Sequence, residues 1–210
     1  MNRQSTFIFA LLALFSFRAT AQIIIDKGIY KVNFSNTMHV PRYVSYMLYK
    51  GGGDCDRKKE GFDFKNDMPE LECAKKADYT NSGYERGHLV NAEDFAFSCP
   101  KEELTFRYYN CLPQTQSANH SNWLKFETEI RKWSQTEKLY IITGGYFKNK
   151  KTGVNKDIAV PAWCWKVVQS VKTKKVLFCG MFSNEKVSVY TPLTIPQLEK
   201  ELHSKIILLK

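Results

Sequence analysis

The segment from residue 85 to residue 127 gathers side chains that can activate water, bind a cation and stabilise negative charge. An imidazole, two carboxamides, a carboxylate and an arginine are supplied by His88, Asn110, Asn119, Glu127 and Arg86. Phosphodiester hydrolysis needs a base for water, a metal for the phosphoryl oxygens and a cation for the charge that builds up in the transition state. This set therefore indicates a phosphodiesterase site.

These residues belong to an ordered series of motifs. Glu85-Arg86-Gly87-His88 is followed by Asn110-Cys111-Leu112-Pro113-Gln114, then by Asn119, Trp123 and Glu127, with further matches at 78–84, 140–145 and 160–168. The series resembles the DNA/RNA non-specific endonuclease family, whose signature is Asp-Arg-Gly-His, then Asn-x-x-Pro-Gln, a metal-binding Asn and a Glu. The resemblance covers the chain from about Pro41 to Phe182.

The resemblance implies an α+β chain with the ββα-metal, or His-Me finger, nuclease fold, in which helices flank a central, mainly antiparallel sheet. It implies an endonuclease that uses Mg²⁺, or Mn²⁺, to cut DNA and RNA with little sequence preference. In this family pattern, Asn119 is the only direct protein ligand of the metal, and Asn110 orients or supports the catalytic groups.

We expect His88 to be the general base, because an imidazole has the unperturbed pKa best suited to removing a proton from water near neutral pH. A buried, hydrogen-bonded histidine is the alternative interpretation. His120, next to Asn119, is the only serious rival for the base.

Asn119 offers a neutral oxygen, which suits a hard cation that keeps most of its waters. Glu127 follows eight residues later, and on a helix its direction would differ by only about 80°, so both can face one metal site. We therefore expect Glu127 to take part in catalysis and to hold the metal through water. An N-cap or surface amide is the alternative for Asn119, and an exposed pair with Arg131 is the alternative for Glu127.

Arginines are expected to stabilise the transition state and to bind substrate. Arg57 best matches the family's upstream catalytic arginine, and Arg86 and Arg131 are the expected substrate contacts. Arg42, Arg86 or Arg131 can also fill the role assigned to Arg57, and for Arg86 a structural ion pair with Glu85 is an equal alternative.

Three positions depart from the family pattern. Glu85 replaces Asp, Asn91 replaces a frequent Pro, and Ala118-Asn119-His120-Ser121 replaces a Leu-Asn-x-Gly run. The last change alters the metal-binding turn and creates a glycosylation sequon at Asn119, which metal binding there would exclude.

The elements that must position these residues follow from β-branched and aromatic runs and from helical spacing. Strands are expected near 30–33, 44–48, 89–91, 140–144, 159–169 and 175–182, and short helices at 92–97 and 101–106, with Pro100 as the break between them. A long helix is expected over 116–134, with Trp123, Phe126, Ile130 and Trp133 as its core stripe. A terminal helix is expected from Pro196 toward Leu209.

The first 21 residues have the pattern of a cleaved secretory signal peptide, with Arg3, an apolar run and Ala19-Thr20-Ala21 before Gln22. An uncleaved anchor is the alternative. We expect residues 22–210 to form one secreted or periplasmic domain with no stable membrane association.

Without its leader the chain has 29 Lys+Arg against 21 Asp+Glu, a net charge of +8, which suits DNA and RNA as partners. The lysine runs at 148–151 and 172–175 are more typical of solvated loops than of substrate contacts.

Six cysteines in a chain expected to be exported indicate disulfides, and the absence of a C-x-x-C pair argues against structural zinc. A hairpin centred between Val171 and Lys172 would place Cys164 opposite Cys179, as a disulfide or as a reduced buried pair. Cys55 with Cys73 and Cys99 with Cys111 are the simplest local closures.

Two other functions fit the same residues. One is an inactive relative that binds nucleic acid, and the other is a secreted nuclease toxin or effector. The sequence indicates neither the oligomeric state nor a preference between DNA and RNA.

Overall fold

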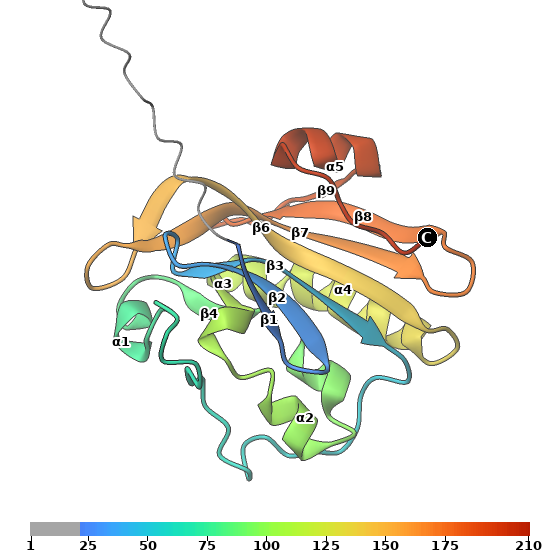
Figure 1. Cartoon of the computed structure of the whole chain (residues 1–210), viewed down its shortest axis with the longest axis horizontal. Helices are drawn as coiled ribbons and strands as arrows, with labels where there is room; N and C mark the ends of the chain where they lie inside the picture. The colour runs from blue at the N-terminus through green and yellow to red at the C-terminus, as the bar shows by residue number, and fades with distance from the viewer. Residues whose placement is uncertain (1–21) are drawn as a thin grey trace, which may run out of the picture.

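A seven-stranded antiparallel sheet forms the centre of the molecule (Figure 1). The computed structural model describes residues 22–210, so the expected signal peptide lies outside the described residues. The strand order is β1-β2-β3-β6-β7-β8-β9. In chain order these strands are β1 (Ile23–Asp26), β2 (Tyr30–Ser35), β3 (Val40–Leu48), β6 (Leu139–Thr152), β7 (Ile158–Ser170), β8 (Val176–Ser183) and β9 (Tyr190–Pro192).

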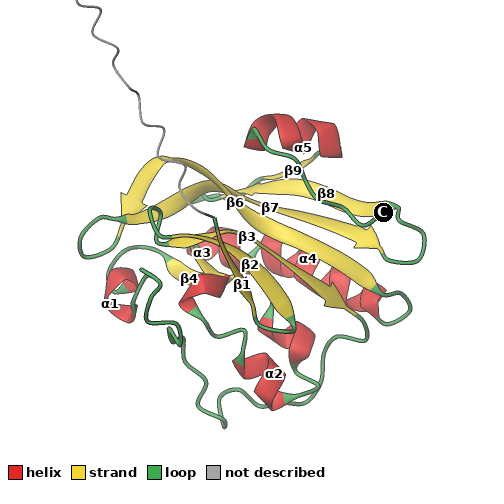
Figure 2. Cartoon of the chain, in the orientation of Figure 1, coloured by secondary structure: helices red, strands yellow, loops and turns green. Residues whose placement is uncertain are grey.

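A smaller unit carries the motif residues. It contains the two-stranded antiparallel sheet of β4 (Glu85–His88) and β5 (Cys111–Gln114), followed by helices α3 (Gln116–His120) and α4 (Asn122–Ser134). The other helices are α1 (Lys76–Tyr79), α2 (Cys99–Glu103), α5 (Ile195–Leu202) and the 3₁₀ turns Ala92–Phe95 and Tyr108–Asn110 (Figure 2). This arrangement of a mainly antiparallel sheet with flanking helices confirms the predicted α+β class.

The central sheet is buried on both faces, because successive side chains of a strand point to opposite sides. On β7, Cys164 and Val168 join the larger core, which includes Trp123 and Ile130 of α4. Trp165 joins a second core, which contains Leu198 of α5. In Figure 1, α4 and α5 accordingly lie on opposite sides of the sheet.

The predicted apolar stripe on the long helix is confirmed. Trp123 and Ile130 are buried, and Phe126 and Trp133 pack against the same core. A single helix over 116–134 is wrong, because Ser121 leaves the helical region, with φ −105° and ψ −114°, and separates α3 from α4.

Several predicted boundaries differ from the structure. No strand covers 89–91 in the described chain; the strand there is β4, which ends at His88. Pro100 does not separate two helices but lies in the first turn of α2, where its missing N–H costs nothing. The terminal helix ends at Leu202 because His203 takes a left-handed conformation, with φ 49°.

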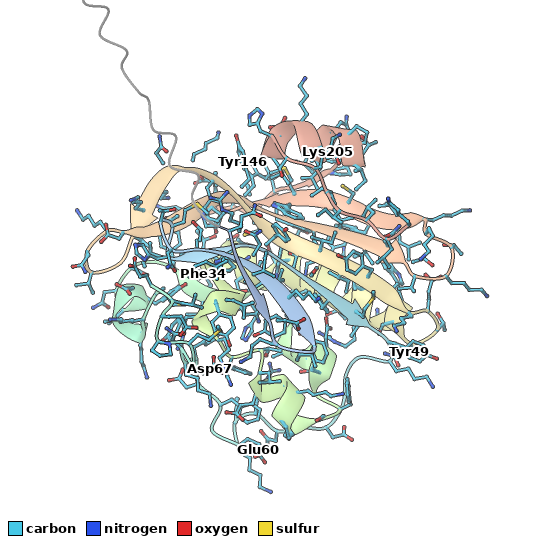
Figure 3. The ribbon with its side chains drawn as sticks, in the orientation of Figure 1. Phe34, Tyr49, Glu60, Asp67, Tyr146 and Lys205 are labelled. Atoms are coloured by element: carbon cyan, nitrogen blue, oxygen red, sulfur yellow. A yellow bond between two sulfur atoms is a disulfide. The ribbon has the colours of Figure 1, made fainter. Side chains whose placement is uncertain are left out.

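Side-chain hydrogen bonds hold the long segment between β3 and α1 in place. Asp67, which is labelled in Figure 3, accepts hydrogen bonds from Lys27, Arg107 and Tyr109. Burial alone would raise the pKa of Asp67, but these donors hold it well below its usual range. This segment brings Arg57 and Phe64 to the motif residues, as described below.

None of the three predicted disulfides is present, although Cys164 and Cys179 are reduced and buried, as their alternative interpretation has it. The structure contains a Cys55–Cys99 disulfide, and the other four cysteines are free and buried. The β7–β8 register pairs Cys164 with Phe182 and Val167 with Cys179. This three-residue offset from the predicted register puts the two cysteines on opposite sheet faces, so they cannot be bridged.

Loss of the disulfide should destabilise the fold. Cys55 and Cys99 are 44 residues apart, and opening a loop of that length costs about 4 kcal/mol in the chain-entropy treatment. We expect the Cys55→Ser, Cys99→Ser variant to lose roughly this much free energy of unfolding in denaturant titrations. Reductant should lower the stability of the wild type but not of the variant. A variant as stable as the wild type would contradict the assignment.

Among residues 22–210, no helix is long and apolar enough to cross a membrane.

Candidate active site

The β4–β5 ladder sets the directions of the motif side chains. Glu85 pairs with Gln114, Gly87 with Leu112 and His88 with Cys111. A Cβ at position 87 would overlap the side chain of the buried Gln114, so the glycine leaves the space that the Gln114 carboxamide occupies. Along such a strand, Arg86 and His88 point to one side and Glu85 to the other.

His88 lies in an aromatic setting. Its ring centroid is 4.6 Å from that of Phe64 and 4.9 Å from that of Phe106, and the Phe106 ring meets it edge-on at 83°. The Nε2 atom is buried, with no hydrogen-bond partner in the described chain. Burial, together with the positive charges of Arg57 and Arg86, lowers the pKa of His88 to about 3. The imidazole is therefore neutral at pH 7, as a proton acceptor must be.

The low pKa of His88 predicts that cleavage activity stays nearly constant as the pH falls from 8 to 6. An imidazole of pKa 6.5 would be about three-quarters protonated at pH 6, and its activity as a base would fall roughly fourfold from pH 8. Because the folded protein keeps His88 neutral across this range, we expect kcat/KM for DNA cleavage to change less than about twofold. A fall with an apparent pKa near 6.5 would show that an exposed histidine controls the reaction.

Asn119 and His120 meet at one carboxylate. Asn119 Nδ2 donates to Glu85 Oε2 at 2.8 Å, and His120 Nε2 lies 2.7 Å from the same oxygen. Asn119 Oδ1 has no donor among the described residues, so it is available to a cation. The alternative of an N-cap is wrong, since Thr115 caps α3. His120 is more exposed than His88 and already paired.

Glu127 is buried, so an exposed pair with Arg131 is wrong. Its Oε2 accepts from Asn91 Nδ2 at 2.5 Å, and Lys166 Nζ lies 3.4 Å from its Oε1. Lys166 is itself only 1% exposed, and its ammonium lies 4.2 Å from the Trp123 ring centroid. The Glu127 carboxylate is therefore one half of a buried ion pair with Lys166.

Arg131 continues this buried network from the next turn of α4. It donates to Asn91 Oδ1 at 2.9 Å and to Asp94 Oδ1 at 3.1 Å, and Tyr46 donates to the other Asp94 oxygen. Burial raises the pKa of Asp94 to about 6, with Glu127 adding to the rise and Arg131 opposing it. With these ties, Arg131 orders the Glu127 region.

The positive charges of Arg57 and Arg86 both lower the pKa of His88. Arg57 is half exposed, donates to Glu93 at 2.8 Å and lies 3.7 Å from the buried Glu102 carboxylate. Arg86 pairs with Asp63 at 2.7 Å. Its alternative pairing with Glu85 is wrong, because Glu85 faces Asn119 instead.

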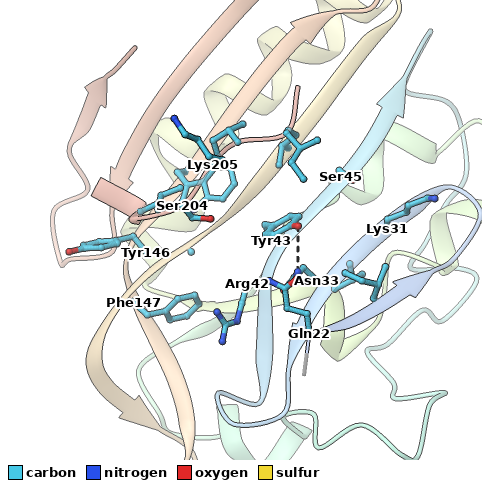
Figure 4. A pocket seen from close by; sticks show the side chains of 18 of the residues that line it. Gln22, Lys31, Asn33, Arg42, Tyr43, Ser45, Tyr146, Phe147, Ser204 and Lys205 are labelled. Atoms are coloured by element: carbon cyan, nitrogen blue, oxygen red, sulfur yellow. Dashed lines mark hydrogen bonds between the residues drawn. The ribbon is translucent and has the colours of Figure 1, made fainter. Parts of the chain in front are cut away.

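Arg42 is excluded as the catalytic arginine by its position. It lines a cavity with Asn33 and Tyr43 on the α5 side of the sheet (Figure 4). That face is opposite the one covered by α4, so Arg42 lies away from the motif residues.

Asn110 holds the backbone behind His88. Its Oδ1 accepts from the Val90 amide at 3.0 Å, and its Nδ2 donates to the carbonyls of Val90 and Thr105. Fully buried, it fixes the residues just after β4 and supports the site without facing it.

The predicted residues therefore fall into three neighbouring groups, around His88, Asn119 and Glu127. In the described chain no hydrogen bond or ion pair joins one of these three residues directly to another. Sequence reasoning missed Phe64, Asp63 and Lys166. Only Lys166 carried a signal, as a single charge inside an otherwise apolar predicted strand.

The chain is similar in sequence to known proteins over most of its length. Residues 13–199 match the sequence model of a family described as DNA/RNA non-specific endonuclease. The chain belongs to this family. Among family members, it is 28% identical over 195 residues to nuclease C1 of Cunninghamella echinulata var. echinulata, covering 83% of this chain and 77% of that protein.

Other relatives are longer than this chain. Human mitochondrial nuclease EXOG is 28% identical over 183 residues, which cover 78% of this chain and 50% of that protein. The mitochondrial nuclease 1 of Schizosaccharomyces pombe is 32% identical over 132 residues, which cover 56% of this chain and 41% of that protein. The chain thus spans half or less of the length of these two relatives.

The fold is also that of a solved structure. A chain in the crystal structure of the EndoG/EndoGI complex superposes with a TM-score of 0.73 at 24% identity, covering 86% of this chain and 83% of that one.

Proposed function

We propose that the chain is a Mg²⁺-dependent endonuclease that hydrolyses phosphodiester bonds of DNA and RNA with little sequence preference. The observation that carries the proposal is His88, an imidazole kept neutral by burial and by two arginines, on the strand that the family signature identifies. The nuclease relatives and the positive net charge support a polyanionic substrate.

In the proposed reaction, the neutral imidazole of His88 takes a proton from the water that attacks phosphorus. Arg57 and Arg86 supply positive charge beside it, and a phosphate entering between them would favour the imidazolium that proton transfer creates. Lys166 and Asn91 hold the Glu127 carboxylate in its buried position, and Arg131 holds Asn91. Bond cleavage at the 3′ oxygen leaves a 5′-phosphate product.

The described residues suit a divalent cation held by Asn119 better than one held by several carboxylates. Among the described residues, no group of three or more His, Cys, Asp or Glu side chains is placed to hold a metal. Asn119 Oδ1 would hold the ion directly, and Glu127 would act through water. Bound Mg²⁺ would supply Lewis-acid stabilisation of the phosphoryl oxygens and of the leaving group.

We further propose that the functional form is residues 22–210, a single domain exported after cleavage near Ala21. The apolar leader and its Ala19-Thr20-Ala21 site support export. N-terminal sequencing of the protein recovered outside the cytoplasm tests this, and a recovered chain that begins at Met1 would contradict it.

Plasmid DNA and a structured RNA, incubated with residues 22–210 in Mg²⁺ or EDTA, test the proposed activity. We expect both substrates to be degraded in Mg²⁺, with 5′-phosphate ends, and to stay intact in EDTA. Salt-sensitive binding without cleavage would identify an inactive relative. Cleavage unaffected by EDTA would rule out the metal-dependent mechanism.

A further inference from the structure

The hairpin of β6 and β7 carries three exposed lysines at one end of the sheet. They are Lys148, Lys150 and Lys151, and none makes an ion pair with any described residue. Figure 1 shows this hairpin at the end of the sheet that also holds α1 and β4. The second lysine run, at 172–175, lies in the β7–β8 turn at the opposite end.

Contacts fix the hairpin beside the motif segment. Lys150 Nζ lies 5.3 Å from the ring centroid of Tyr84, the residue directly before β4. Beyond the lysines, the Val154 amide donates to Asp78 Oδ1 at 3.0 Å and ties the hairpin end to α1. The lysines therefore occupy a fixed position next to the strand that carries His88.

A hollow adjoins the same edge. It is lined by Gly83 and the exposed Lys186, and by residues of α3 and its flanks, including Gln116 and His120. Thr115 Oγ1 donates to the Glu185 carbonyl at 2.9 Å, which holds the Lys186 loop against the start of α3. Gly83 and Tyr84 thus lie between the hairpin lysines on one side and α3, which carries Asn119, on the other.

We propose that Lys148, Lys150 and Lys151, together with Tyr84 and Lys186, form a secondary surface that binds the nucleic acid strand outside the scissile bond. Lysines neutralise backbone phosphates, and the Tyr84 ring holds the Lys150 ammonium in position on this surface. Tyr84 precedes His88 by four residues, or roughly 13 Å of extended chain, which a strand of B-form DNA covers in about four base pairs. This surface rests on the proposed function, since it extends the substrate path of that site.

Two variants of equal charge test the surface. One replaces Lys148, Lys150 and Lys151 by Gln, and the other replaces Lys172, Lys174 and Lys175 by Gln. Binding of a fluorescent 30-base-pair DNA is measured in EDTA over a series of salt concentrations, so that cleavage plays no part. We expect the hairpin variant to show a log Kd against log salt slope shallower by about two to three, near one per lost phosphate contact. The turn variant should keep the wild-type slope.

Cleavage assays separate this inference from the proposed function. In Mg²⁺, the hairpin variant should show a higher KM for the 30-base-pair DNA with an unchanged kcat. If the wild type cleaves DNA but the two variants have the same salt slope, the surface is wrong and the proposed function stands. If the wild type neither binds nor cleaves, both are wrong. Equal loss of slope in both variants would show general electrostatic attraction only and would also overturn the surface.

Discussion

Replacing His88 by Ala should lower plasmid cleavage in Mg²⁺ by about 10²- to 10⁴-fold, the range typical for loss of a general base. The remaining activity reflects the cation and the arginines, which do not depend on the imidazole. The rate is measured under saturating DNA, and circular dichroism and thermal unfolding confirm that the variant is folded. His88 packs against the rings of Phe64 and Phe106, and its replacement leaves the arginines and lysines in place, so DNA binding in EDTA should stay near the wild-type value.

His120→Ala is the matched control for this loss. His120 is half exposed and lies at the same carboxylate as Asn119, so it is the residue that would replace His88 if the assignment were wrong. We expect His120→Ala to keep most of the cleavage rate. A large loss in His120→Ala together with near-normal activity in His88→Ala would transfer the role of base to His120.

Replacing Lys166 by Met should lower the free energy of unfolding by about 3–5 kcal/mol, because it leaves the Glu127 carboxylate buried without its cation. Both side chains are almost fully buried, at 1% and 6% exposure. The same change should displace Glu127 and reduce cleavage even at temperatures where the variant is folded. Urea denaturation measures the first effect, and the plasmid assay measures the second.

Two further variants show whether this effect comes from the buried charge. Lys166→Met combined with Glu127→Gln removes both charges, and we expect it to recover part of the stability lost in the single variant. Lys175→Met, in the exposed β7–β8 turn, should change stability by no more than about 0.5 kcal/mol. If the single and double variants are equally unstable, packing around the lysine stem would explain the loss, and the ion pair would not.

Elements with a strong apolar period could be predicted from the sequence. The stripe of Trp123, Phe126, Ile130 and Trp133 was visible because helical spacing places all four on the buried face. The strand at 85–88 was not visible, because Glu-Arg-Gly-His has no apolar alternation. A functional motif in a two-stranded sheet is stabilised by its neighbours and has little strand propensity of its own.

Contacts between distant segments were beyond sequence reasoning. Nothing in the spacing pairs Lys166 with Glu127, or Phe64 with His88, because these contacts depend on how the sheet packs against the helix and the loop. The cysteine pairs failed for a related reason. The β7–β8 turn is centred later than expected, and a register offset of three residues separates Cys164 from Cys179.

The candidate residues themselves could be predicted, but their grouping could not. Asn119 is bonded to Glu85, three residues before His88 on β4, and has no direct bond to His88 in the described chain, so their shared role in one reaction depends on the substrate and the ion.

The measurement that tests the central claim most directly is plasmid cleavage by residues 22–210, followed side by side for the wild type, His88→Ala and Asn119→Ala in Mg²⁺, with the wild type repeated in EDTA. We predict rapid conversion of supercoiled plasmid by the wild type in Mg²⁺ only, and a loss of at least about 10²-fold in both variants. Full activity in either folded variant, or in EDTA, would contradict the mechanism.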